Sequence, residues 1–198
     1  GQDNYCMIGN HAIPVLSDAI LANLPGIDKE ATYRAMVESS TRPHLNSPFK
    51  IWEKYGYMPQ NLQNTSVSIT LEQAFDDWCV AQVAKHLGHT ADYERFSKRA
   101  QYYRNLYDPQ TGFFRPKDDK GQWIEPFDPL SYEQPCFIEG NAWQYMWFVP
   151  QDPQGLMELM GGRDAFLKKL DENFTLTATS GERNGNASGF IGQYAHGN

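Results

Sequence analysis

The chain has 198 residues, of which 40% are hydrophobic and 14% aromatic, a composition typical of a globular domain rather than a disordered segment. Its formal net charge is −7 and its lysines and arginines do not cluster, which argues against a partner such as nucleic acid. No apolar run approaches the roughly 18 residues that cross a bilayer, so no membrane span is expected. The three cysteines are too scattered for a zinc site, and their odd number leaves at least one thiol without an internal partner.

Apolar residues recur at helical spacing along most of the first half of the chain, and Gly, Pro and Asp mark the ends of the segments. Asp28 is predicted to cap one of these helices, Gly88 to close another and Thr90 to cap the next. The helices expected in this half cover about 11–24, 29–39, 49–55, 66 or 68 to 87, and 91–107.

Residues 108–137 are rich in Pro and Gly, and they are predicted to form a long loop. Helices are then expected over about 140–148, 153–160 and 163–174, before a tail rich in Gly, Asn and Ser. No alternating pattern of strand length occurs. Helices in antiparallel pairs with long irregular connections suit a toroid of helical hairpins, so the predicted fold class is all-α.

The clearest sign of chemistry is a carboxylate, Glu139, directly before a helix that carries the aromatic residues Trp143, Tyr145, Trp147 and Phe148. Trp143 and Trp147 are four residues apart, so they are expected on one helix face. Aromatic surface partly desolvates a neighbouring carboxylate, and desolvation raises a carboxyl pKa, which suits a general acid. The alternative is that Glu139 only caps the helix, with its charge near the positive end of the dipole.

Several segments, in a shared order, resemble glycoside hydrolase family 92, the calcium-dependent exo-α-mannosidases. Each match is weak alone, but together they span nearly the whole chain. The similar segments are CMIGNHA at 6–12, LEQAFDDWCVAQ at 71–82, DPQTGFFRPK at 108–117, PFDP at 126–129, EGNAWQY at 139–145, WFVPQD at 147–152, LMGG at 159–162 and GFIGQYAHGN at 189–198.

This resemblance implies part of an (α/α)6 toroid, with the active site among the loops at one end. By the same comparison, residues 1–198 are a partial catalytic domain that lacks the family's β-rich N-terminal domain and the remainder of the barrel. The intact enzyme would be an inverting exo-α-mannosidase that removes terminal α-linked mannose from N-glycans or mannans, in the periplasm or outside the cell. A non-catalytic helical module that binds mannosides or serves as a scaffold remains the alternative.

The resemblance assigns the role of general acid to Glu139. An inverting glycosidase needs a second carboxylate about 6.5–9.5 Å away to activate water. The family's base lies C-terminal to residue 198, so the isolated segment is expected to be inactive. Substrate contacts are expected from residues in or near the matching segments, namely Asn141, Trp143, Gln193, His196, Asn198 and Asp77.

Alternatives stay open for several of these residues. Asp76 and Asp77 are adjacent on a helix, so only one is expected to point inward, and both could be purely structural. His196 could shape its loop rather than touch sugar. His11 is interpreted as a hydrogen-bonded core residue rather than a catalyst.

The resemblance also implies calcium in the intact enzyme. Calcium prefers six to eight oxygen ligands, and no Asp-rich ligand loop occurs in the sequence. We therefore expect no complete calcium site, and no bound cofactor, in these residues alone. A partial toroid would expose apolar helix faces, so self-association is also expected.

Overall fold

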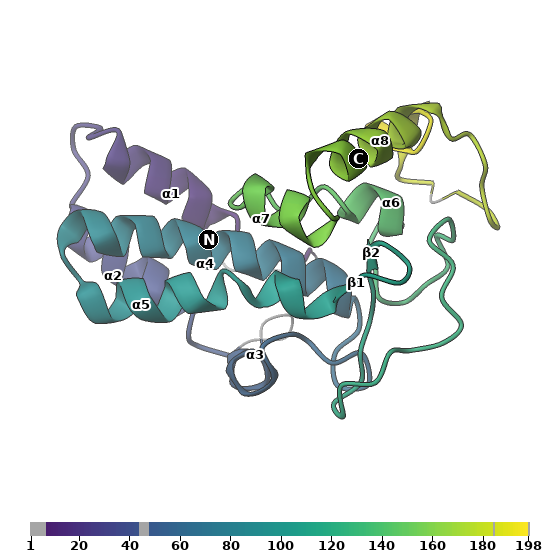
Figure 1. Ribbon diagram of the computed structural model, residues 1–198. Coiled ribbons are helices and arrows are strands. Elements are labelled where there is room, and N and C mark those ends of the chain that lie inside the picture. Colours follow the sequence, from purple (N-terminus) through teal and green to yellow (C-terminus); the bar gives the residue numbers. More distant parts are fainter. Residues whose placement is uncertain (1–6, 44–47, 184, 198) are drawn as a thin grey trace. The chain divides into compact units, whose positions relative to one another are not determined.

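A computed structural model of the chain describes residues 7–43, 48–183 and 185–197, and most of its regular structure is helical (Figure 1). Within these ranges no helix is both long enough and apolar enough to span a bilayer. Cys79 and Cys136 are buried free thiols, whereas Cys6 lies outside the described residues.

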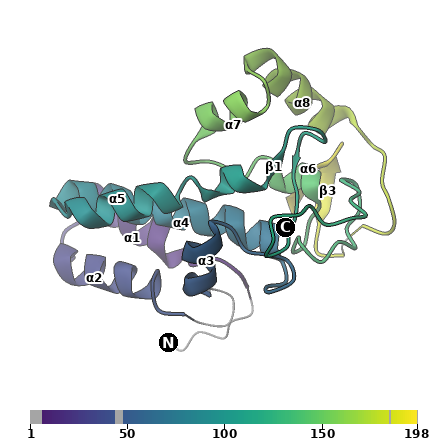
Figure 2. The same cartoon turned by 60° about the horizontal axis from the view of Figure 1, so that its bottom comes forward.

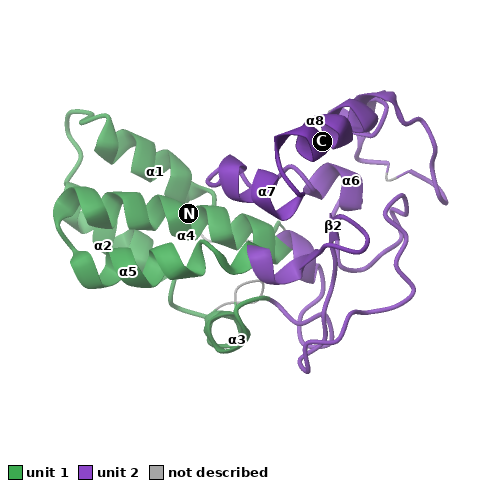
Figure 3. Cartoon of the chain, in the orientation of Figure 1, with its two compact units in different colours: residues 1–57, 69–103 green, residues 58–68, 104–198 purple. Residues whose placement is uncertain are grey.

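The chain forms two compact units (Figure 3). Unit 1 comprises residues 1–57 and 69–103, and unit 2 comprises residues 58–68 and 104–198. The longest helix is α4 (Ser66–Leu87). Its first residues belong to unit 2 and the rest belong to unit 1, so one boundary between the units falls within this helix.

Unit 1 is a helical bundle in which α1, α2 and α5 lie alongside α4 (Figures 1 and 2). The bounds of the helices that join α4 are α1 (Ala12–Leu21), α2 (Lys29–Ser39), α3 (Phe49–Tyr55) and α5 (Thr90–Arg99). Buried side chains from α1, α2, α4 and α5 form one core cluster: Ile13, Ile20, Tyr33, Met36, Val80, Val83 and Phe96. Because other helices pack on α4 from several sides, α4 has no wide solvent-exposed face in its central turns.

In unit 1, two of the three predicted capping residues mark a helix end. Asp28 caps α2 as predicted, because its carboxylate accepts the backbone N–H of Ala31 at 3.0 Å. Gly88 ends α4 with a φ of 85°, which glycine adopts at little cost. The predicted cap at Thr90 is wrong, since Thr90 lies inside α5 and His89 occupies the N-cap position.

The helix expected over 91–107 is shorter than predicted. It ends at Arg99, and a 3₁₀ helix, η1 (Tyr102–Leu106), follows. Tyr103 and Leu106 are fully buried. The tighter 3₁₀ winding changes which residues face inward, and no Gly or Pro marks that change in the sequence.

Unit 2 contains shorter helices and small antiparallel hairpins. The helices are α6 (Ala142–Tyr145), α7 (Pro153–Leu159) and α8 (Arg163–Thr175). The hairpins pair β1 (Tyr107–Asp108) with β2 (Phe113–Phe114), and β3 (Ser188–Ile191) with β4 (Tyr194–Gly197). The all-α prediction is therefore wrong for these strands, which are too short to leave an alternating pattern in the sequence.

The rest of the 108–137 segment is a long loop, as predicted, and a buried arginine holds it. Arg115 donates to Asp108 at 2.9 Å, to Glu125 at 2.6 Å and to the carbonyl of Ile124 at 3.1 Å. Its guanidinium lies 4.7 Å from the ring centroid of Phe127. Charge-assisted bonds of this kind hold an irregular backbone in place of regular pairing.

His11 joins the start of α1 to α4. Its Nδ1 lies 2.9 Å from Asp76 Oδ1, and its Nε2 lies 3.1 Å from Glu72 Oε2. The predicted hydrogen bonding is confirmed, but the predicted core position is wrong, because 44% of the side chain is exposed. Hydrogen bonds that the imidazole donates to Asp76 and Glu72 raise the pKa of His11 to about 10, so the imidazole is charged at neutral pH.

We predict that this arrangement makes unit 1 less stable in alkali. The pKa of His11 rises from an ordinary 6.5 to about 10 on folding. The contribution of His11 to the free energy of unfolding is therefore complete below pH 6.5, and it is lost as the pH rises through 10. His11→Gln should lower the free energy of unfolding at pH 6 and flatten its decline between those values. Urea unfolding at a series of pH values, followed by circular dichroism, measures both effects. An unchanged pH profile in the variant would contradict the assignment.

Candidate active site

Glu139 lies in a tight turn that leads into α6. Its φ of 51° is in the left-handed region, which a glutamate rarely adopts. The preceding residue, Ile138, is held at both of its backbone groups, because the Tyr145 hydroxyl donates to its carbonyl at 3.0 Å and its N–H donates to the Ser68 hydroxyl at 3.1 Å. The ring of Phe137 stacks on Tyr145. Strained residues held by their surroundings concentrate at functional sites. Glu139 shares this backbone conformation with Asn23 and Thr65 among the non-glycine residues that the structure describes, so the strain supports a role for Glu139 only together with its contacts.

The Glu139 side chain is half-buried and hydrogen-bonded across the fold. The Asn186 Nδ2 donates to Glu139 Oε1 at 2.7 Å, from a position 47 residues further along the chain. The alternative in which Glu139 caps α6 is wrong. Asn141 is the cap, and its Oδ1 accepts the backbone N–H groups of Trp143 and Gln144 at 3.0 and 3.3 Å.

Asn141 and Gln193, both expected to bind substrate, are brought together in a buried network. Their exposed fractions are 0% and 1%. Asn141 Nδ2 donates to Gln193 Oε1 at 3.4 Å, and Gln193 Nε2 donates to the carbonyls of Leu176 and Ala178 at 2.9 and 2.7 Å. These bonds join α6 to the β3–β4 turn, and a substrate contact by either residue stays a prediction.

Trp143 is also buried, with 6% of its surface exposed. Its ring packs edge-on against Phe113 of β2, with the centroids 5.0 Å apart. The predicted shared helix face with Trp147 is wrong, because α6 ends before Trp147, which packs instead against Phe166 of α8. Trp143 therefore contributes to the core of unit 2, and a contact between Trp143 and sugar stays a prediction.

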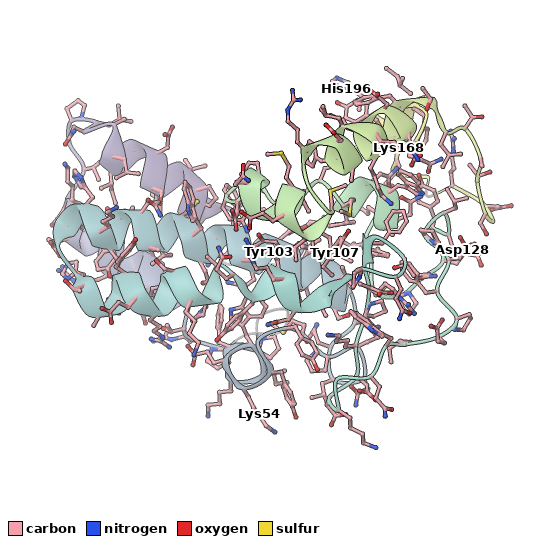
Figure 4. The ribbon with its side chains drawn as sticks, in the orientation of Figure 1. Lys54, Tyr103, Tyr107, Asp128, Lys168 and His196 are labelled. Atoms are coloured by element: carbon pink, nitrogen blue, oxygen red, sulfur yellow. The ribbon has the colours of Figure 1, made fainter. Side chains whose placement is uncertain are left out.

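His196 lies exposed on β4, and Figure 4 labels its position. Its Nδ1 is 3.0 Å from the hydroxyl of Tyr194, two residues earlier on the same strand. Asn198 lies outside the described residues. A substrate contact by His196 or Asn198 stays a prediction.

Asp77 belongs to unit 1 and is fully buried. Arg99 donates to both of its oxygens at 2.8 Å, and the Trp52 indole N–H donates at 2.9 Å. Burial raises the pKa of Asp77 to about 6, against the opposing effect of the Arg99 charge. The expectation that only one of the two aspartates points inward is wrong, since Asp76 is also fully buried and accepts the backbone N–H of Asn10 at 2.8 Å.

In the part of the chain that the structure describes, the His, Cys, Asp and Glu side chains form no group of three or more that could hold a metal ion. Calcium in the intact enzyme therefore rests on the family resemblance alone.

Asn186 is the residue at this site that the sequence did not reveal. Its signals in the sequence were a place in a tail rich in Gly, Asn and Ser and the Asn-Ala-Ser tripeptide that it begins, and neither points to Glu139. Its proximity to Glu139 depends on the β3–β4 hairpin, which left no pattern in the sequence.

Comparison with known proteins gives the same family as the sequence motifs. The family model for the glycosyl hydrolase family 92 catalytic domain matches residues 1–198. The chain is similar to the family GH92 alpha-mannosidase BT3965 from Bacteroides thetaiotaomicron, with 40% identity and a TM-score of 0.91, over 100% of this chain and 26% of that one. It is also similar to the family GH92 inverting mannosidase BT2199 from Bacteroides thetaiotaomicron, with 35% identity and a TM-score of 0.81, over 88% of this chain and 24% of that one.

A further relative, from Arthroderma benhamiae, is described as an uncharacterized secreted glycosidase. It is 26% identical over 204 residues, which cover 84% of this chain and 26% of the relative. The chain belongs to glycosyl hydrolase family 92, and it spans about a quarter of the length of these relatives.

We predict that Arg99→Met strongly destabilises unit 1. The substitution leaves the buried Asp77 carboxylate without its charge partner, and breaking a buried pair in this way costs about 3–5 kcal/mol. Arg42→Met is the matched control, because it removes only an exposed pair with Glu38, worth roughly 0.3–0.5 kcal/mol. Urea unfolding followed by circular dichroism compares the two, and similar losses of stability in both would contradict this interpretation of the Asp77–Arg99 pair.

Proposed function

We propose that this chain is part of the catalytic domain of an inverting exo-α-mannosidase and that Glu139 is its general acid. The proposed substrate is a glycan with terminal α-linked mannose, such as an N-glycan or a mannan. Membership of family 92 and the likeness to an inverting mannosidase support the reaction type. The observation that carries the assignment to Glu139 is its strained backbone together with a carboxylate held by a hydrogen bond from Asn186.

In this mechanism, Glu139 protonates the glycosidic oxygen while the bond to the anomeric carbon breaks. A second, ionised carboxylate takes a proton from the water that attacks the opposite face of the sugar. The Asn186 amide donates to Oε1 of this acid. We propose that the base, and the ligands of the family's calcium ion, come from other parts of the enzyme.

The same family membership supports two coarser proposals. The helices of this chain would form part of an (α/α)6 toroid in the whole enzyme, a proposal that agrees with regular structure that is mostly helical. The enzyme would act in the periplasm or outside the cell, as the description of the Arthroderma relative as secreted suggests.

In the full-length protein that contains this chain, Glu139→Gln should lower kcat for an α-linked mannobiose by roughly 10²–10⁴-fold, because acid catalysis contributes that much. The rate on 2,4-dinitrophenyl α-mannoside should fall far less, since its leaving group departs without a proton. Release of mannose and of dinitrophenolate measures the two rates.

Glu182→Gln is a matched control, because Glu182 is an exposed glutamate in the same unit. It should leave both rates unchanged. A loss of less than tenfold on mannobiose for Glu139→Gln would overturn the acid assignment. A full-length protein that binds mannosides without cleaving either substrate would instead favour the non-catalytic alternative.

A further inference from the structure

We infer that Asn186 is a positioning residue that fixes the orientation of the Glu139 carboxyl group for proton transfer, an inference that rests on the proposed acid role of Glu139. The Asn186 Nδ2 donates to Glu139 Oε1 at 2.7 Å. A glutamate side chain has three rotatable bonds, so an unrestrained carboxyl group spends much of its time in unproductive orientations. A fixed donor to one oxygen restricts the carboxyl group to fewer orientations.

The chain around Asn186 is attached to unit 2 on both sides. Before it, Ser180 forms a parallel bridge with Ser131. After it, Ala187 is buried, with 7% of its surface exposed, and β3 begins at the next residue. The exposed Asn186 therefore lies directly before a buried residue and the start of a strand.

A second contact joins the two segments that carry the Glu139–Asn186 pair. Asn141 lies two residues after Glu139, and it donates to Gln193 in the turn of the hairpin that follows Asn186. The Gln193 N–H also donates to the carbonyl of Asn173 in α8 at 2.7 Å. The turn at Glu139 and the hairpin are thus held together by buried contacts that do not involve the pair itself.

An asparagine suits this role better than a charged donor. Its amide N–H does not titrate, so it donates to Oε1 whether Glu139 is protonated or ionised. It can therefore hold the acid before and after proton transfer. A lysine or arginine in its place would stabilise the ionised form and oppose the role of an acid.

Asn186→Ala in the full-length protein tests the inference. We expect kcat on α-linked mannobiose to fall about 10- to 100-fold, because misplacement of a reacting group by about 1 Å costs up to about 10²-fold. KM should change less than twofold, and the rate on 2,4-dinitrophenyl α-mannoside should be nearly unchanged. A variant that had only lost local structure would lose rate on both substrates.

Asn186→Leu is the second variant, because leucine keeps nearly the shape of asparagine and has no donor. It should reproduce the loss on mannobiose even where the alanine variant folds poorly, as judged by circular dichroism. Glu182→Gln, at an exposed residue of the same segment, should match the unsubstituted enzyme on both substrates.

The double variant separates this inference from the proposed function. If Asn186 acts through Glu139, then Asn186→Ala should cause no further loss in a Glu139→Gln background. Unchanged mannobiose kinetics in both single Asn186 variants, or an additive loss in the double variant, would overturn the positioning role. A loss of less than tenfold for Glu139→Gln alone would overturn the acid assignment itself.

Discussion

The candidate site depends on one buried amide, that of Asn141. Its oxygen accepts the N–H groups that begin α6, while its backbone N–H donates to the side chain of Gln144 at 3.0 Å. Its Nδ2 donates to Gln193 in the β3–β4 turn. Aspartate would also cap the helix, but it has no N–H to donate to Gln193. Asparagine at this position therefore holds both the start of α6 next to Glu139 and the β3–β4 hairpin that follows Asn186 in the sequence.

In unit 1, buried carboxylates specify how the helices pack. Asp76 and Asp77 are adjacent on α4 and fully buried, and they are bound by partners from different parts of the unit. Asp76 receives the backbone N–H of Asn10 at the start of α1, whereas Asp77 receives Arg99 from the end of α5. Apolar contacts alone would let the helices slide along one another. Each buried carboxylate is satisfied only in one register, because leaving it unpaired would cost several kcal/mol.

The sequence predicted those features that a local chemical signal marks. It located α2, α3 and α8 to within about a residue, and it placed the cap of α2 at Asp28. It failed where tertiary packing decides the outcome, as at the early end of α5 and in the short length of α6. The hairpins were missed because strands of two to four residues leave no periodic pattern. The partner of Glu139 was missed for the same reason, since only the β3–β4 hairpin brings that residue near.

The hydrogen bond to Glu139 has a consequence for how the protein is produced. Asn186 begins the tripeptide Asn-Ala-Ser, the acceptor sequence for N-linked glycosylation in the eukaryotic secretory pathway. An oligosaccharide would be attached to Nδ2, the same atom that donates to the Glu139 carboxylate. Attachment there replaces an N–H and places a bulky group beside the carboxyl group. A yeast or insect secretion host would therefore alter the environment of Glu139, whereas a bacterial host without this modification leaves the amide intact.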